Sequence, residues 1–414
     1  MDAAGSSPGE AEALKRRFRR GQGARQIKAL ALIAPLFLFL LVIFLLPIGR
    51  MISLAVKNEE LQAALPATTA ALREWDGTGQ PPSSVLTALI GELPTALAAR
   101  TLAVAAQRLN HEAPGMRSVV MRTARALTTA PSTGDPLATL MAADPAWAEP
   151  ETWLVLRRAA EPWTDLYLLA ALDLRRDAAG KIVAVPPSEA IFVDVLVRTF
   201  AISGMVTLLC LLLGFPISYL MAQQPPGRAA LLIILVLLPF WTSLLVRISA
   251  WVVLLQNEGI INGALLRLRF IETPLPLMYN RFGVVVAMTH VLLPFLVLPL
   301  YSVMRGISAT TMRAAASLGA PPQSAFLRVY LPQAAPGVAA GCLLVFILAI
   351  GYYITPALVG GAGDQMISYF IAFYTNRSVN WGLAAALATL LLAATAVLYA
   401  VYSRLAGSAG MKLG

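Results

Sequence analysis

Long runs of apolar residues, each about the length needed to cross a membrane, dominate the pattern of the chain. A helix needs about 20 predominantly apolar residues to span a hydrocarbon core about 30 Å thick, because it rises about 1.5 Å per residue. Six runs approach or exceed this length: residues 30–48, 191–221, 229–255, 282–303, 335–356 and 381–402. They predict an all-α polytopic membrane protein with six transmembrane helices in a lipid bilayer.

Basic residues before the first run predict the orientation of these helices. Residues 1–28 form a basic tail, and such an excess marks the cytoplasmic flank of a membrane helix; its members are Lys15, Arg16, Arg17, Arg19, Arg20, Arg25 and Lys28. An even number of spans then places both termini, including the tail 406–414, in the cytoplasm of a bacterial inner-membrane protein. Three arginines in a predicted outer loop count against this orientation, but the dense tail outweighs them: Arg267, Arg269 and Arg281.

The first run has a second interpretation, as the apolar part of a signal peptide. That part is normally about 7–15 residues long and precedes a small-residue cleavage site. The run 30–48 is longer, and no clear site follows it. We therefore expect a retained transmembrane helix over residues 29–49.

Residues 50–188 separate the first span from the other five and have a different composition. They hold most of the acidic residues and four tryptophans, Trp75, Trp147, Trp153 and Trp163. Apolar residues recur at helical spacing between turns, as in the stripe Leu86, Leu89, Ile90, Leu93 and Leu97. A turn at 177–180 joins 172–174 to 182–185, which is the pattern of a short hairpin. We predict a mainly helical extracytoplasmic insertion between helices 1 and 2, followed by a five-helix core over residues 189–405.

Overall composition agrees with a membrane protein and narrows its chemistry. The chain is 58% hydrophobic and 13% charged, whereas about 25% of a soluble domain is charged. The net charge of +10 would suit a nucleic-acid partner, but no basic face interleaved with aromatic residues appears, so we expect none. Cys210 and Cys342 lie inside apolar runs, where packing is their expected role.

No constellation of residues typical of catalysis or of metal binding is visible. The two histidines, His111 and His290, are too few for a multi-histidine metal site, and no phosphate-binding Gly-x4-Gly-Lys-Ser/Thr loop occurs. We expect no catalytic residue, metal or cofactor, so any ATP hydrolysis belongs to another chain. His290 lies in the fourth span, where an ionisable group is a functional candidate. A neutral histidine bonded to a backbone carbonyl is the simpler alternative.

The loop over residues 305–332 carries the most informative pattern. It predicts a short helix over residues 310–318 with Gly319 as its C-terminal cap, and a second short helix that Pro321 and Pro322 open and that ends before Pro332. Small side chains in the first helix allow another surface to approach closely, and three larger ones offer apolar anchors: Phe326, Val329 and Tyr330. By itself this pattern is also compatible with an ordinary surface helical hairpin.

This loop resembles the cytoplasmic EAA loop of binding-protein-dependent ABC importers. That pattern is Glu-Ala-Ala, three residues, Gly, nine residues, an aliphatic residue, one residue and Leu-Pro. The matching positions here are Ala314, Ala315, Gly319, Val329, Leu331 and Pro332. The glutamate alone departs from the pattern, because Arg313 replaces it and inverts the charge.

Further stretches over about residues 191–402 resemble one branch of these permeases, the spermidine/putrescine type. They are 238–247, 291–301 and 351–367. The resemblance implies a permease that pairs with a second permease subunit as a heterodimer, binds two ATPase subunits at the coupling loop, and receives solute from an extracytoplasmic solute-binding protein. A polyamine-like solute such as spermidine or putrescine is implied first, with another small organic solute as the alternative.

Candidate residues for the solute path lie in or beside the predicted spans. A polyamine cation would prefer acidic or aromatic neighbours, although interfacial or packing roles are equally compatible with each candidate. The candidates are Trp241, Arg247, Trp251, Glu258, His290, Tyr352, Tyr353 and Asp364. A secondary transporter would need carboxylates at mid-membrane, whereas Asp194 and Asp364 lie near span ends.

Overall fold

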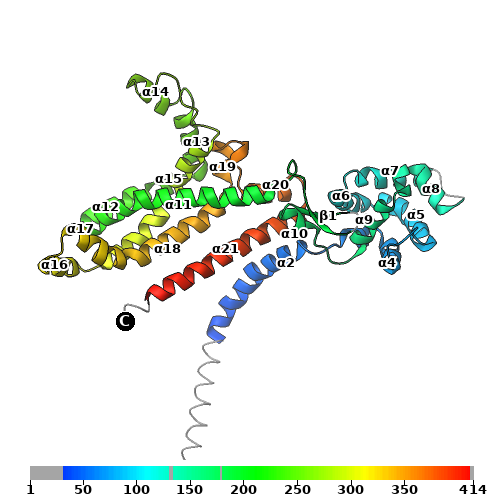
Figure 1. The fold of residues 1–414 in the computed structure, drawn as a ribbon, viewed down its shortest axis with the longest axis horizontal. Coiled ribbons are helices and arrows are strands. Elements are labelled where there is room, and N and C mark those ends of the chain that lie inside the picture. The colour runs from blue at the N-terminus through cyan, green and yellow to red at the C-terminus, as the bar shows by residue number, and fades with distance from the viewer. Residues whose placement is uncertain (1–30, 130–133, 178–179, 411–414) are drawn as a thin grey trace, which may run out of the picture. The chain divides into compact units, whose positions relative to one another are not determined.

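The computed structural model of the chain describes residues 31–129, 134–177 and 180–410, and the side chains among them up to residue 404 (Figure 1). The predicted tail 1–28 and residues 411–414 lie outside the described residues. The chain divides into two units, Met1–Leu54 and Ala55–Gly414. Among the described residues, six helices are long and apolar enough to cross a membrane, as the sequence predicts.

The first unit contributes one of these helices, Ala31–Leu54. It includes a π-helical turn, Leu41–Leu45, and α2 (Leu46–Leu54). Its large side chains are exposed within the unit, as expected for a helix whose partner is lipid. The helix extends five residues beyond the predicted end at residue 49.

Three long helices of the second unit pack side by side and form the centre of the membrane core (Figure 1). They are α11 (Phe192–Gln223), α15 (Arg281–Gly306) and α18 (Leu331–Ile350). Small residues permit their close approach: a Cβ on Gly214 would lie 2.6 Å from Cδ2 of Leu296, and one on Gly337 would lie 2.8 Å from Cβ of Val303. Such contacts replace the hydrophobic driving force that lipid cannot supply.

The prediction of a continuous third span over residues 229–255 is wrong. The chain forms α12 (Pro226–Leu237) and a 3₁₀ turn (Leu238–Trp241), and then restarts as α13 (Leu244–Leu255). Pro239 supplies no backbone donor, and the Ser243 hydroxyl accepts a hydrogen bond from the Val246 amide, which caps the new helix. The helix pair α13 and α14 (Ile260–Arg267) forms the candidate span Leu244–Arg267.

Shorter helices complete the core around these spans. The helix α16 (Ala309–Ser317) confirms the first predicted short helix. The second prediction is wrong, because α17 (Pro322–Ala325) does not end before Pro332 and continues through a π-helical turn (Phe326–Tyr330) into α18, which makes one helix of Pro322–Ile350. Beyond α18 the elements are α19 (Ile354–Val359), α20 (Ile367–Asn376) and α21 (Trp381–Gly410).

The insertion is helical and has its own apolar core, as predicted. Its helices are α3 (Glu60–Ala64), α4 (Pro66–Glu74), α5 (Ser83–Ala98), α6 (Leu102–Glu112), α7 (Met116–Thr129), α8 (Pro136–Ala143), a 3₁₀ turn (Pro145–Ala148), α9 (Pro150–Ala160) and α10 (Leu166–Ala171). Helices α5 and α6 meet at 118° and bury apolar residues in this core. The predicted hairpin is confirmed as antiparallel strands β1 (Leu174–Arg176) and β2 (Ile182–Ala184).

Two tryptophans lie at the centre of the insertion core. The rings of Trp147 and Trp153 are 5.0 Å apart. Burial of an indole requires a partner for its N–H group. Trp147 donates to Thr123 Oγ1 at 2.8 Å and Trp153 donates to the Trp147 carbonyl at 2.9 Å. Trp163, in contrast, is 64% exposed.

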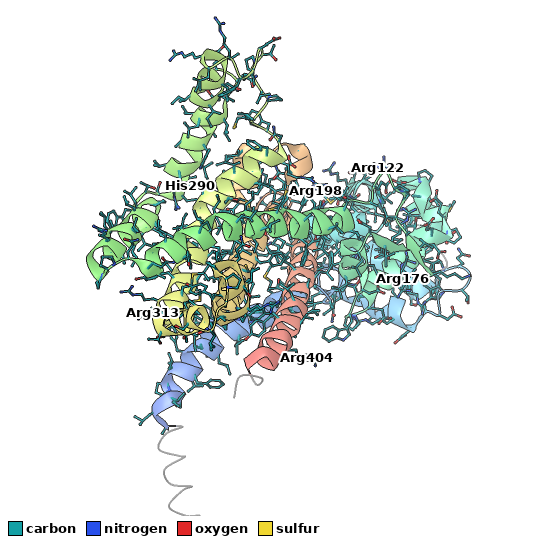
Figure 2. All side chains as sticks on the ribbon, turned by 60° about the vertical axis from the view of Figure 1, so that its left-hand side comes forward. Arg122, Arg176, Arg198, His290, Arg313 and Arg404 are labelled. Atoms are coloured by element: carbon teal, nitrogen blue, oxygen red, sulfur yellow. The ribbon has the colours of Figure 1, made fainter. Side chains whose placement is uncertain are left out.

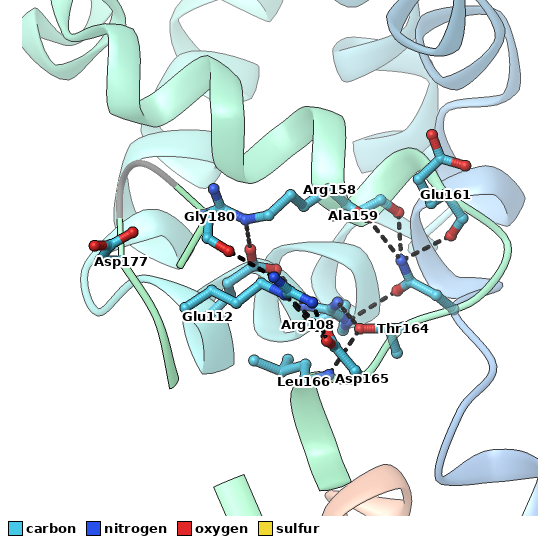
Figure 3. A network of polar contacts seen from close by, with 12 residues as sticks. Arg108, Glu112, Arg158, Ala159, Glu161, Thr164, Asp165, Leu166, Asp177 and Gly180 are labelled. Carbon is cyan, nitrogen blue, oxygen red and sulfur yellow. Dashed lines mark hydrogen bonds and ion pairs between the residues drawn. The ribbon is translucent and has the colours of Figure 1, made fainter. Parts of the chain in front are cut away.

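A buried polar network joins the two ends of the insertion (Figure 3). Arg108, 2% exposed, donates to Asn58 Oδ1 at 2.8 Å and to Glu112 Oε2 at 3.1 Å. Glu112 also accepts from Arg158 Nε at 2.5 Å. The Asn58 side chain donates to the Ala159 carbonyl at 2.8 Å, which links residues about a hundred positions apart. The network therefore fixes the start of the insertion against the end of its helical core.

Candidate functional site

The predicted coupling loop lies at the end of the core where α11 and α15 both finish. Arg305, in the last turn of α15, donates from Nη1 to the carbonyls of Ala222 and Gln224, each at 2.9 Å. The Ser308 hydroxyl then accepts from the Thr310 amide and begins α16. The loop is thus attached to two spans before its two helices begin.

Gly319 makes the bend between α16 and α17. Its φ is +82°, a left-handed conformation that costs other residues about 1–2 kcal/mol. The Ala320 amide donates to the Ala315 carbonyl at 3.1 Å, which closes the end of α16. An added Cβ on Gly319 would meet nothing within 4 Å, so the backbone conformation alone requires glycine here.

The tip of this loop is exposed and basic. Leu318 is 88% exposed and Leu327 is 58% exposed. Arg313 is also exposed (Figure 2), and within the described part of the chain it forms no ion pair. Sequence reasoning missed Leu318, because an apolar residue within an amphipathic helix does not by itself indicate which way it faces.

Two of the predicted apolar anchors point into the protein instead. Phe326 packs edge-on against Phe215 and Tyr219, with ring centroids 6.1 and 5.6 Å apart, and Tyr330 is 7% exposed. This corrects the expectation that Phe326 and Tyr330 are presented to a partner. They pack the loop against α11. Val329 is half-buried, and Leu331 and Pro332 begin α18.

Two of the eight solute-path candidates contact each other directly. The Trp251 indole Nε1 donates to His290 Nδ1 at 3.1 Å, and the two rings meet edge to face at 5.6 Å. These residues come from α13 and α15, and Figure 2 shows His290 on α15. Among the described residues, the histidine's hydrogen-bond partner is therefore a side chain and not the backbone carbonyl of the simpler alternative.

Arg247 and Tyr352 belong to the same region. Arg247 lies one helical turn before Trp251 on α13. It is close enough to His290 and to Tyr352 for its charge to interact with both side chains. Tyr352 follows α18 and packs against the core of the three long helices. The structure thus brings together four of the predicted candidates, which we call the aromatic-arginine cluster: Arg247, Trp251, His290 and Tyr352.

The other four candidates do not join this cluster. Asp364 is 8% exposed and accepts from Arg281 Nε at 3.2 Å and from the Gly361 amide at 3.2 Å, near the start of α15. Glu258 lies exposed in the turn between α13 and α14. Trp241 and Tyr353 are 76% and 43% exposed. No group of three or more His, Cys, Asp or Glu side chains able to hold a metal occurs within the described residues.

About half of the chain is similar to known proteins. It is 35% identical to the spermidine/putrescine transport system permease protein PotB of Haemophilus influenzae over 214 residues, which cover 52% of this chain and 75% of that protein. It is 33% identical over 190 residues to the inner membrane ABC transporter permease protein YdcU of Escherichia coli, covering 43% and 59% of the two chains.

Among solved structures, the crystal structure of a bacterial alginate ABC transporter in complex with an alginate pentasaccharide-bound periplasmic protein matches with a TM-score of 0.42 and 17% identity. That match covers 51% of this chain and 77% of the other. No family model matches the sequence.

Proposed function

Because this chain belongs to the PotB family of ABC transporter permease proteins, we propose that it forms one half of the translocation path of an importer that takes up a small organic solute. The chain is a multi-pass inner-membrane protein, and as a permease subunit it is not itself catalytic. Its part in transport is mechanical, since it carries the solute path and passes on a movement generated elsewhere.

The coupling loop is the observation that carries the proposal. A left-handed glycine sets α16 against the start of the helix that continues into α18. The loop exposes Leu318 and Arg313 at its tip, and Phe326 and Arg305 attach its base to α11. A loop that is attached to the core and has an exposed apolar tip is suited to bind a partner subunit whose movement it passes on. We assign that role to one of two ATPase subunits, with a second permease subunit completing a heterodimer.

The proposed topology follows from the basic tail and the six spans. Both termini lie in the cytoplasm with the coupling loop, and residues 50–188 lie outside. A solute-binding protein would then land on the outer side, where the insertion is. Docking that protein is one role for the insertion, and capping the bundle or supporting the second permease is the other.

Two observations bear on the chemical class of the solute. The relatives' name favours a polyamine such as spermidine or putrescine, and the aromatic side chains of Trp251 and Tyr352 are compatible with an organic amine. The carboxylates do not favour it. Asp364 is paired with Arg281, and Asp194 is paired with Arg198 at the start of α11.

The test is assembly of the complete importer from the full chain. Tagged wild-type protein is expected to copurify from its native membrane with an ATPase and a second permease, and proteoliposomes holding the complex and the binding protein should show ATP-dependent uptake. Leu318→Asp should abolish ATPase copurification, whereas Leu172→Asp, an equally apolar exposed position on the insertion, should not. Normal ATPase binding by Leu318→Asp would remove the loop from the docking surface.

A further inference from the structure

One face of α16 is exposed and carries Arg313. Exposed residues recur three and four positions apart, so they lie on one side of the helix and of its end: Thr310, Arg313, Ala314, Ser317 and Leu318. Thr311, Met312 and Ala315 are half-buried on the other side. A partner that binds the exposed face therefore meets small neutral side chains, one large apolar side chain and one cation.

Arg313 lies within this face and not at its border. Its Nε is 3.5 Å from the Ala309 carbonyl of the preceding turn. Five positions separate it from Leu318, which is a distance of about 7.5 Å along the helix axis. Ala314 and Ser317 lie between the two and are too small to hold a partner away from the guanidinium. A partner surface that covers Leu318 therefore covers Arg313 as well.

The core of this chain has no carboxylate near the loop. Residues 195–257, which include the end of α11, and residues 273–363 and 365–414 contain neither Asp nor Glu. Asp364 lies between the last two segments and pairs with Arg281, the first residue of α15. The loop follows the last turn of that helix, which has 26 residues and is about 39 Å long.

A protein surface that covers the loop must supply a counter-charge. A second arginine, Arg328, is exposed in the π-helical turn that α16 contacts, so the loop as a whole is cationic. A guanidinium in water needs no partner, but one that a protein covers loses its hydration and is costly unless a carboxylate pairs with it. Its N–H groups form a fixed fork that matches the two oxygens of a carboxylate. The carboxylate for Arg313 must therefore come from the molecule that binds the loop.

We propose that the ATPase subunit that binds the coupling loop presents an Asp or Glu side chain to Arg313, beside an apolar socket for Leu318. This inference rests on the proposed function, because it takes the loop as the ATPase-binding surface. The EAA pattern has a glutamate at this position, so the contact here has the opposite polarity. An ATPase with a cation opposite residue 313 would be rejected by repulsion between like charges.

A zero-length cross-link tests the carboxylate directly. Arg313→Lys keeps the charge and introduces an amine, and residues 307–332 contain no lysine of their own. In the complex purified from its native membrane, a carbodiimide should join this amine to an Asp or Glu of the ATPase, which mass spectrometry of the joined peptides identifies. The wild-type complex should give no product from the loop. Absence of the product from an Arg313→Lys complex that retains its ATPase would overturn the inference.

The affinity of the ATPase tests the charge itself. Purified ATPase is titrated onto permease complexes in nanodiscs from which it has been removed. Arg313→Glu should weaken binding by at least about 10-fold, Arg313→Met should weaken it less, and Arg313→Lys should retain most of it. Arg404→Glu makes the same change of charge at an exposed residue of α21 outside the loop, and it should change affinity little (Figure 2).

Three results of this titration would overturn the inference and leave the importer proposal intact. They are wild-type affinity of Arg313→Glu, equal loss of affinity in the Lys, Met and Glu variants, and a loss that occurs with phosphatidylglycerol in the nanodisc but not with phosphatidylcholine alone. The second would assign Arg313 a role in shape, and the third would show that an anionic lipid is its partner. Failure of the proposed function looks different, because the wild-type chain would then bind no ATPase or Leu318→Asp would bind it normally.

Discussion

The ring of Tyr167 lies directly against the Cα of Gly382, so that no side chain fits at residue 382. Tyr167 belongs to α10 of the insertion, and Gly382 is in the first turn of α21. The ring is 4% exposed, and the Arg108 guanidinium lies 5.6 Å from its centroid. Burial raises the pKa of Tyr167 to about 12. One contact thus connects the polar network of the insertion with the start of the last span.

Enlarging Gly382 should loosen this contact. In Gly382→Leu the new side chain and the Tyr167 ring compete for one space, and overpacking of this kind costs about 1–3 kcal/mol. We expect a lower melting temperature in detergent and faster proteolysis between α9 and β1. Gly204→Leu is the control, because a Cβ there meets nothing within 4 Å. Equal melting temperatures for the two variants would show that the contact contributes nothing to stability.

Acid should weaken the insertion through His111. Burial, with the nearby Arg108 charge, lowers the pKa of His111 to about 4 from 6.5. The folded state therefore binds fewer protons than the unfolded state between these values, so its stability falls as pH drops from 6.5 to 4. One proton gives a slope of at most about 1.4 kcal/mol per pH unit.

His111→Gln should flatten this dependence. Glu60, Arg108 and Arg117 line the same pocket and remain in the variant, so the difference between the two proteins isolates the imidazole. Melting temperatures of the full chain in detergent are compared from pH 7 to pH 4. Parallel curves for wild type and variant would exclude His111 as the source.

The membrane spans were predictable because the bilayer leaves little choice of structure: about 20 apolar residues without charge form a helix or do not enter. The hairpin was predictable from its turn. The break before α13 was predictable only in part. Pro239 favours a kink within the apolar run, but a kink does not reveal that the chain leaves the helix and restarts at the cap formed by Ser243.

The site was predictable as a set of residues and not as an arrangement. Trp251 and His290 meet only because α13 packs against α15, which no periodicity within either helix reveals. The inward position of Phe326 depends on the contact of its ring with Phe215 and Tyr219 of α11, which the loop sequence alone does not show. Arg247 was chosen from the sequence as a path candidate, but only the structure shows that its Nε and Nη1 atoms are buried without a partner among the described residues.

The topology can be tested with two single cysteines. In a chain without Cys210 and Cys342, Gln80→Cys places a thiol on an exposed loop of the insertion. It should react with an impermeant thiol reagent in intact cells, whereas Ala316→Cys, exposed in the coupling loop, should react only after lysis. The neighbouring Gly79 is a poorer position, because its φ of +66° would strain a cysteine. The opposite labelling pattern would reverse the orientation.

The bend at Gly319 can be tested by paired substitutions. Gly319→Leu carries the backbone cost of a left-handed residue, about 1–2 kcal/mol, and should displace α17 relative to α16. Asparagine tolerates this conformation, so Gly319→Asn should retain more function. We expect normal membrane insertion of both variants, with ATPase copurification and uptake reduced in Gly319→Leu alone. Unchanged uptake by Gly319→Leu would remove the bend from the coupling mechanism.

Hydrogen bonds between the two ends of the helical domain show where it can be deleted. The Asn58 amide donates to the Pro162 carbonyl at 3.1 Å, and the Thr164 amide donates to the Val56 carbonyl at 2.8 Å. Entry and exit of the helical domain therefore lie side by side, and a short Gly-Ser turn can replace residues 59–161. This deletion keeps α10 and its contact with Gly382, which a longer deletion to residue 177 would remove.

If the helical domain docks the binding protein, this deletion should weaken binding-protein affinity and lower uptake, while the ATPase activity of the assembled complex persists. The six spans should still insert, because none of their packing residues belongs to 59–161. Affinity is measured with the complete complex in nanodiscs, and copurification of the second permease serves as the control for assembly. Undiminished affinity of the assembled complex would exclude docking by this domain. Loss of the second permease from the purified deletion variant would instead identify the domain as a structural support for the pair, since a docking surface alone would not hold the two permeases together.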